Sequence, residues 1–269
     1  MSKILEFQKL IVIYLPCYNT ELAIIDTLSN IPEEFHDKIE CLIVDNNSED
    51  STTDKVSKEV GRGTFPFKIH LIKTKENLGY AGSQKLAYSL ITRSTVVEHV
   101  IMLHGDGQYD PSLMKKFLPL IEKSYGVIYA YRDKSLFRDK EETPIVTYLI
   151  IKILSWLENF LTGFNIKEWH NGFVLYQNDF LRKIPLQLLS DFPHIDGELI
   201  IVAGILQEKT TSIPIYKRYK DHAPFQGFGR IKHVLTVFKV IYRFRRKYYH
   251  RILKDGNPSE VSYDFDIIL

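Results

Sequence analysis

The sequence predicts an α/β protein with a mostly parallel central sheet and flanking helices. Short apolar runs alternate with segments of helical periodicity along the first half of the chain. Polar, turn-forming residues follow most of these runs where they end. Right-handed crossovers between parallel strands bring such ends to one edge of the sheet, where open α/β sheets bind their ligands.

In the first half, five buried strands are expected, at residues 11–15, 40–44, 68–72, 100–103 and 126–131. Pro16 ends the first strand. Helices are expected between the strands, at residues 20–31, 51–60, 80–91 and 111–124. Thr20 is a suitable N-cap for the first helix, with Glu21 in its favourable first turn.

The second half is expected to continue the same domain. A charged loop at 138–143 precedes an apolar helix at 144–161, which Lys152 and Glu158 interrupt, so no membrane span is predicted. A strand at 173–177, a helix opening at 191–198 and running to 206, and a strand at 211–216 follow. We therefore predict one domain over residues 1–228.

The last forty residues are predicted to form two further parts. Residues 230–254 are basic and aromatic with helical spacing, which fits either an interfacial helix on anionic lipid or a core-packed helix with a solvated basic face. This helix, over 229–256, is expected to be packed on the domain or appended to it. An acidic tail at 257–269 is expected to be loosely held.

The composition is that of an ordinary globular protein. The chain has 269 residues, 45% hydrophobic and 25% charged, and a net charge of +2 that gives no general reason to bind nucleic acid. Cys17 and Cys41 lie in or beside apolar runs, and this cysteine usage favours a reducing cytoplasm. The first ten residues lack the apolar region and cleavage site of a signal peptide.

Four polar clusters should converge at the carboxyl edge of the sheet: residues 16–21, 45–50, 77–84 and 104–108. In the last cluster, Gly105 and Gly107 allow a close approach of backbone or substrate. Asp106 supplies a hard anionic oxygen of the kind that Mg²⁺ or Mn²⁺ prefers. This convergence predicts a ligand pocket.

The motifs in this order resemble family 2 glycosyltransferases of the GT-A fold, a Rossmann-like fold of nucleotide-diphospho-sugar transferases. They are PCYNTE at 16–21, VDNNSEDST at 44–52, NLGYAG at 77–82, HGDGQYDP at 104–111, an arginine after a strand, and HIDGEL at 194–199. The resemblance extends over residues 12–219. Among these enzymes, the dolichyl- and polyprenyl-phosphate sugar synthases are the most similar.

The resemblance implies a nucleotide-sugar site and a divalent metal, Mg²⁺ or Mn²⁺. The implied donor-binding residues are Pro16, Tyr18, Asn19, Asp45, Asn77, Gly79 and Asp106. Asp45 would contact the base or the ribose. Thr20 is inserted before Glu21, which departs from the family pattern.

The implied metal motif is Asp-x-Asp followed by glutamine, and here it reads His104, Asp106 and Gln108. The first aspartate is therefore a histidine. Neutral imidazole can bind a metal ion, or His104 can instead hydrogen-bond the ribose or the backbone, and both alternatives stay open. Asp106 and the nucleotide are expected to hold most of the metal.

The catalytic roles depend on the acceptor. Metal at Asp106 and the cation of Arg132 would stabilise the diphosphate leaving group. A sugar-hydroxyl acceptor needs a general base, for which Asp196 is the best candidate and Glu198 the alternate, although acids are common at helix N-termini. A lipid phosphate needs no base, and Arg132 could bind it together with Arg218 and Lys220.

We expect an inverting glycosyltransferase of cell-envelope biogenesis that moves a sugar from a UDP- or GDP-sugar to a polyprenyl or dolichyl phosphate. Transfer to a sugar hydroxyl of a cell-surface glycan, or nucleotide-sugar binding without turnover, are the alternatives. A Rossmann-type oxidoreductase is disfavoured because PCYNTE replaces the glycine-rich turn after the first strand. The expected location is cytoplasmic, with peripheral contact to a membrane left open.

Overall fold

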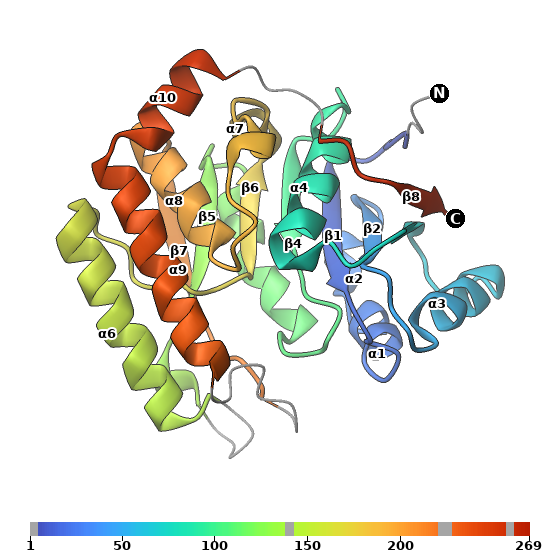
Figure 1. Ribbon diagram of the computed structural model, residues 1–269. Coiled ribbons are helices and arrows are strands. Elements are labelled where there is room, and N and C mark those ends of the chain that lie inside the picture. Colours follow the sequence, from blue (N-terminus) through green and yellow to red (C-terminus); the bar gives the residue numbers. More distant parts are fainter. Residues whose placement is uncertain (1–4, 138–142, 220–227, 257–260) are drawn as a thin grey trace.

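The computed structural model describes residues 5–137, 143–219, 228–256 and 261–269, which build one central sheet with helices on both faces (Figure 1). The order of the strands is β7-β5-β6-β4-β1-β2-β3-β8. Their bounds are β1 Ile11–Cys17, β2 Ile39–Asp45, β3 Lys68–Thr74, β4 His99–Met102, β5 Val127–Arg132, β6 Val174–Gln177, β7 Thr210–Ile215 and β8 Phe265–Ile267.

The sheet is mostly parallel, as predicted. β1 lies between β2 and β4 and pairs with both in parallel, and β5 pairs with β7 in parallel. β6 runs antiparallel to both β4 and β5, so it begins at the edge where they end. The residues just before β6 therefore join the polar turns at that edge.

One face of the sheet is covered by α4, α7, α8, α9 and α10, whose apolar side chains meet alternate strand residues such as Val12, Tyr14 and Met102. These helices span Gly79–Thr92, Asn178–Arg182, Ile195–Ile205, Phe228–Arg245 and Tyr248–Asp255. α6 (Ile145–Thr162) lies outside them, along α9 (Figure 1).

The opposite face is covered by α1 (Ile24–Ser29), α2 (Glu33–His36), α3 (Thr52–Gly61) and α5 (Leu118–Ile121). Short 3₁₀ segments are η1 (Pro111–Lys116), η2 (Lys134–Leu136) and η3 (Leu186–Leu188). Cys17 and Cys41 are both buried and unpaired on this face, as their apolar surroundings predicted.

Two predicted helices in the first half differ from the structure. The first begins at Ile24 rather than Thr20, because the carbonyl of Thr20 accepts bonds from Ala23 and Ile24 in a turn. The helix predicted over 111–124 divides into η1 and α5. Pro119 carries no N–H, so it cannot donate the bond to the Lys115 carbonyl that a continuous helix needs.

The C-terminal predictions also need correction. The basic helix breaks into α9 and α10 at Lys247, which has a left-handed φ of 55°. Val237, Val240 and Ile241 of α9 are buried, so part of this helix packs in the core. The tail is not loosely held at its end, because β8 pairs antiparallel with β3. Most of the charged loop at 138–143 lies outside the described residues.

Candidate active site

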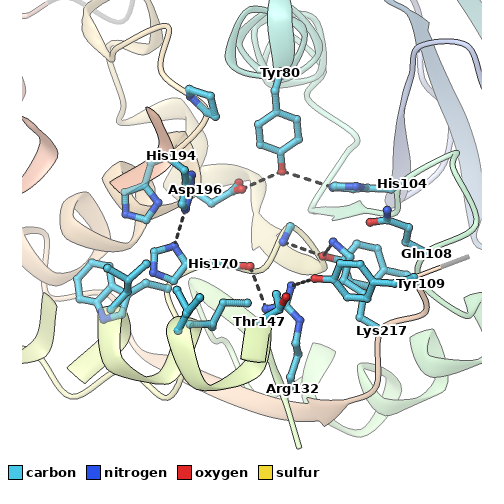
Figure 2. Close-up of a pocket in the computed structure, with 18 of the residues that line it drawn as sticks. Tyr80, His104, Gln108, Tyr109, Arg132, Thr147, His170, His194, Asp196 and Lys217 are labelled. Carbon is cyan, nitrogen blue, oxygen red and sulfur yellow. Dashed lines mark hydrogen bonds between the residues drawn. The ribbon is translucent and has the colours of Figure 1, made fainter. Parts of the chain in front are cut away.

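The four predicted polar clusters do converge at the carboxyl edge of the parallel strands, and two adjacent cavities open there. The larger has a volume of about 350 Å³ and the smaller about 280 Å³. Tyr80, His104 and Asp106 line both, so the cavities are continuous across these side chains. Figure 2 shows Tyr80 reaching from α4 between His104 and Asp196.

The smaller cavity gathers most of the predicted donor-binding residues. Pro16 was predicted to end the first strand, but it lies within β1, and Tyr18 follows that strand. Asn77 precedes α4, and Gly79 is its first residue. Asp106 lines the same cavity from the turn after β4. Gly79 has a φ of 68°, which explains a glycine at this entry to the helix.

Asn19 and Asp45 do not line this cavity, and the structure gives both of them internal partners. The Asn19 side-chain oxygen accepts a hydrogen bond from the backbone of Glu49 at 2.9 Å. Asp45 is fully buried, and its carboxylate accepts bonds from the backbone of Ser48 and the hydroxyl of Thr53. The bond to Asn19 joins the turn after β2 to the turn after β1, and the bonds to Asp45 hold the turn after β2 and the start of α3.

Asn46 is a lining residue that the sequence reasoning missed. Its amide nitrogen donates to the side chain of Asn77 at 3.0 Å and to the carbonyl of Gly79 at 3.2 Å. Its amide oxygen accepts from the backbone of Leu78 at 2.8 Å. Asn46 thus joins two of the four clusters. Its position directly after Asp45 could have identified it as a site residue.

The predicted metal residues lie together at the junction of the cavities. His104 Nδ1 is 3.9 Å from Asp106 Oδ2, a separation that one cation can span, and Figure 2 shows Gln108 near His104. Burial lowers the pKa of His104 to about 4, so its imidazole is neutral and can act as a ligand. The donor set therefore fits a divalent ion held mainly by oxygen atoms.

Asp196 lies in the larger cavity at the first turn of α8. Its two carboxylate oxygens accept hydrogen bonds from the Tyr80 hydroxyl at 2.8 Å and the Gln84 amide at 3.2 Å. Burial raises the pKa of Asp196 to about 6, although both hydrogen bonds oppose the shift. The alternate base, Glu198, is fully buried and instead accepts bonds from Ser190, Arg243 and Tyr249.

Arg132 reaches the larger cavity from the end of β5, but it already has a partner. Its guanidinium and its backbone N–H both donate to the carboxylate of Glu168, which is buried as well. Burial lowers the pKa of Arg132, but Glu168, Tyr219 and Tyr109 together outweigh that effect, so the pKa is raised overall. Of the other predicted cations, Arg218 pairs with Asp110 at 3.5 Å, and Lys220 lies outside the described residues.

Lys217, which the sequence reasoning missed, supplies a second cation to this wall. Its Nζ donates to the Tyr109 hydroxyl at 3.1 Å and lies 4.5 Å from the centre of that ring. Burial and the nearby Arg132 lower the pKa of Lys217 to about 8. Lys217 lies two residues past β7 in a basic stretch of the sequence, which could have indicated a role in the site. It belongs to none of the motifs, however, and was not predicted.

The remaining wall carries His170, His194 and His233, with Glu158 of α6 behind them. Glu158 contacts His170 Nε2 at 2.8 Å and His194 Nε2 at 2.6 Å. Burial alone would raise the pKa of Glu158, but the two imidazoles together have the larger effect and lower the pKa to about 2. None of these residues was predicted to belong to the site.

The sequence model of "Glycosyl transferase family 2" matches residues 12–184, more than half of the chain. The chain belongs to this family. Among curated proteins, this glycosyltransferase is 26% identical to an uncharacterised protein of Methanocaldococcus jannaschii. The 238 aligned residues are 87% of this chain and 90% of the relative.

A second relative, from Methanococcus voltae, is named UDP-N-acetylglucosamine–dolichyl-phosphate N-acetylglucosaminyltransferase. It is 25% identical to this glycosyltransferase over 252 residues, which are 87% of this chain and 94% of the relative. The family and this second relative identify the chain as an enzyme of the transferase class.

Solved structures confirm the GT-A fold of this glycosyltransferase. Glucosyl-3-phosphoglycerate synthase from Mycobacterium tuberculosis, solved with Mn²⁺, UDP-glucose and phosphoglyceric acid, matches with a TM-score of 0.58 at 13% identity, over 87% of this chain and 80% of that one. TarS of S. aureus, solved with UDP-GlcNAc, matches with a TM-score of 0.55 at 15% identity, over 87% and 65%.

Proposed function

We propose that this glycosyltransferase moves a sugar from a nucleotide-diphosphate sugar to a polyprenyl phosphate, with inversion at the anomeric carbon. The observation that carries the proposal is the lining of the larger cavity. Buried cations, Arg132 and Lys217, form one part of it, and apolar side chains of α6, among them Ile150 and Leu154, form another. An acceptor with an anionic head and an apolar tail fits this combination.

The outer side of α6 extends the apolar surface beyond the cavity. Within the described residues, α6 is the one helix long and apolar enough, by length and composition alone, to cross a membrane. Its inner side, including Glu158, packs on the protein. The exposed apolar residues of α6 are Ile145, Val146, Leu149, Ile150, Ile153, Trp156 and Phe160. This amphipathic arrangement supports contact with the membrane surface that holds the acceptor.

The proposed chemistry is a direct displacement between the two cavities. A phosphate oxygen of the acceptor attacks the anomeric carbon of the sugar. The bond from that carbon to the diphosphate oxygen breaks, and its electron pair leaves with the nucleoside diphosphate. The residues that line the smaller cavity, among them Tyr18, Asn46 and Asn77, would hold the nucleotide.

Asp106, His104 and Gln108 would hold the Mg²⁺ or Mn²⁺ ion. The bound ion supplies charge neutralisation for the diphosphate. Lys217 and Arg132 place positive charge on the acceptor side, where they hold the attacking phosphate near the sugar. The acceptor oxygen is already anionic, so no side chain has to remove a proton.

A sugar-hydroxyl acceptor is the second candidate, and Asp196 is the observation in its favour. Its pKa of about 6 suits a general base near neutral pH. Against this role, Tyr80 and Gln84 occupy both carboxylate oxygens. The relative that acts on dolichyl phosphate further supports the lipid acceptor.

The two candidates separate in a transfer assay with vesicle-borne polyprenyl phosphate and a panel of UDP- and GDP-sugars. Lys217→Met should lower kcat by about 10²–10³-fold, the usual cost of removing one preorganised electrostatic group. Asp196→Asn should retain most of the activity. Lys209→Met is the matched control, because Lys209 lies at the other end of β7, where it is exposed and bonds the Lys123 carbonyl.

If the acceptor is a hydroxyl, the order reverses, and Asp196→Asn loses about 10²–10⁴-fold. Arg132→Gln is a poorer probe than Lys217→Met, since it leaves the buried carboxylate of Glu168 unpaired. Removing one partner of such a pair commonly costs about 3–5 kcal/mol of stability.

A further inference from the structure

Three histidines from separate segments meet on the wall of the larger cavity across from the His104–Asp106 pair. His170 precedes β6, His194 stands before the first residue of α8, and His233 belongs to α9. One ring nitrogen from each lies within 4.8 Å of the other two. Figure 2 shows His170 and His194 on the opposite side of the cavity from His104.

The spacing of these nitrogens suits a small transition-metal ion. His233 Nε2 and His170 Nδ1 are 3.2 Å apart. In a tetrahedral zinc site, metal–nitrogen bonds of about 2.0–2.1 Å put neighbouring ligand atoms about 3.3 Å apart. The ring centres of His170 and His194 are 4.9 Å apart, and those of His194 and His233 are 5.6 Å apart.

Glu158 contacts two of the three rings and makes a hydrogen bond to one of them, His194. Its carboxylate oxygens lie 2.8 Å from His170 Nε2 and 2.6 Å from His194 Nε2, and its side chain is 1% exposed. These contacts leave the other ring nitrogen of each histidine for a metal ion. Metal-ligating histidines characteristically donate their second N–H to such a carboxylate.

The backbone is also shaped around His194. A Cβ atom on Gly197 would lie 2.2 Å from His194 Nε2, so only glycine allows the ring to lie against this turn of α8. His194 is 2% exposed, and Glu158 and Gly197 therefore fix the buried ring from two sides.

We propose that His170, His194 and His233 bind a transition-metal ion of the Zn²⁺ class, with Glu158 as the carboxylate behind them. Three nitrogen ligands favour Zn²⁺ over Mg²⁺, which prefers oxygen, so this site is separate from the one at Asp106. All three histidines line the cavity, so the fourth coordination position is open to it. A water molecule or an anionic oxygen completes the coordination.

Metal titration of the full chain, stripped with a chelator, tests the proposal. The Asp106→Ala variant is used as the background, so that the nucleotide-linked site does not contribute. Co²⁺ should bind with one-to-one stoichiometry and give the intense visible absorption of a tetrahedral ion, and Zn²⁺ should displace it. The readout is spectroscopic and needs neither sugar nor acceptor, so it stands even if the proposed transfer reaction fails.

Substitutions added to that background locate the ion. His233→Ala and His170→Ala should abolish the tetrahedral absorption, and Glu158→Gln should weaken binding by about 10–100-fold. His250→Ala is the matched control, because His250 is exposed on α10. Circular dichroism melts show that each variant is folded. The proposal would be overturned if Co²⁺ did not bind with one-to-one stoichiometry. It would also be overturned if binding survived both histidine substitutions in folded protein.

Discussion

At the scale of single residues, Asp106 should be essential for transfer and dispensable for folding. It lies in a turn after β4 with its side chain 39% exposed, and its Oδ1 accepts only a local bond from the Gln108 backbone. Asp106→Ala should therefore abolish Mn²⁺-dependent transfer and leave the melting temperature nearly unchanged. Asp26→Ala is the control, because Asp26 is an exposed residue of α1. Unchanged turnover that still requires metal would remove Asp106 from the metal site.

Lys217 should impose an upper pH limit on activity. Burial, with Arg132 beside it, lowers its pKa from 10.5 to about 8, so the cation proposed to hold the acceptor is lost above that pH. Transfer should decline above about pH 8, and the residual activity of Lys217→Met should not show this decline. A pH–rate profile of the two proteins measures the difference.

Stability should follow the opposite trend over the same range. Between pH 8 and 10.5 the unfolded chain keeps the Lys217 proton that the folded protein releases. The contribution of Lys217 to the free energy of unfolding therefore rises with pH across this window. Denaturant unfolding at both ends of the window shows whether a loss of activity reflects unfolding, which would contradict the assignment to Lys217.

Asp45 was predicted to contact the base or the ribose, and Asp45→Ala was expected to weaken nucleotide binding by about 1–3 kcal/mol. The buried bonds from Ser48 and Thr53 add a structural consequence, because the variant should also unfold at a lower temperature without nucleotide. Calorimetry and melting curves on the same samples give both values. Wild-type nucleotide affinity would exclude the binding role.

The proposed donor-side residues were predictable because they lie near the carboxyl ends of parallel strands. Pro16 lies near the end of β1, and Asn77 and Asp106 lie a few residues past β3 and β4, so strand order alone brings them together. The meeting of Glu158, His194 and His233 was not predictable, since it depends on how α6, α8 and α9 pack. Pairwise long-range packing of this kind leaves no periodic signal in one sequence.

At the scale of elements, the exposed side of α6 should determine binding to membranes. Trp156 and Phe160 are 65% and 72% exposed, and their rings stack on each other. Replacing both by glutamate should reduce sedimentation with anionic vesicles and transfer to vesicle-borne acceptor. Leu22→Glu is the control, because Leu22 is 87% exposed in the turn before α1. Unchanged vesicle binding would assign this surface another role.

Strands and helices were predictable to different extents. Buried parallel strands are short continuous apolar runs, so the predicted strands lie within a residue or two of β1 to β7. Helix ends were less accurate, because the turn at Thr20 and the left-handed Lys247 depend on contacts made elsewhere. β8 was missed since three residues carry too little pattern to reveal a strand.

At the scale of the whole molecule, β8 should protect the edge of the sheet. It covers β3, with Lys75 paired to Asp266 and the backbone of Ile268 donating to Leu71. Removing residues 264–269 should lower the melting temperature and promote association through the uncovered edge. Light scattering and thermal melts of the shortened chain test this, with Lys75→Ala to isolate the ion pair. A monomeric, equally stable product would contradict it.

The continuity of the two cavities has a kinetic consequence. Since Tyr80, His104 and Asp106 line both cavities, the proposed donor and acceptor sites adjoin. The proposed displacement uses no enzyme nucleophile, so no sugar is left on the protein between half-reactions. Initial-velocity plots should therefore intersect rather than run parallel. A single molecule that joins a nucleotide to a polyprenyl phosphonate should compete with both substrates.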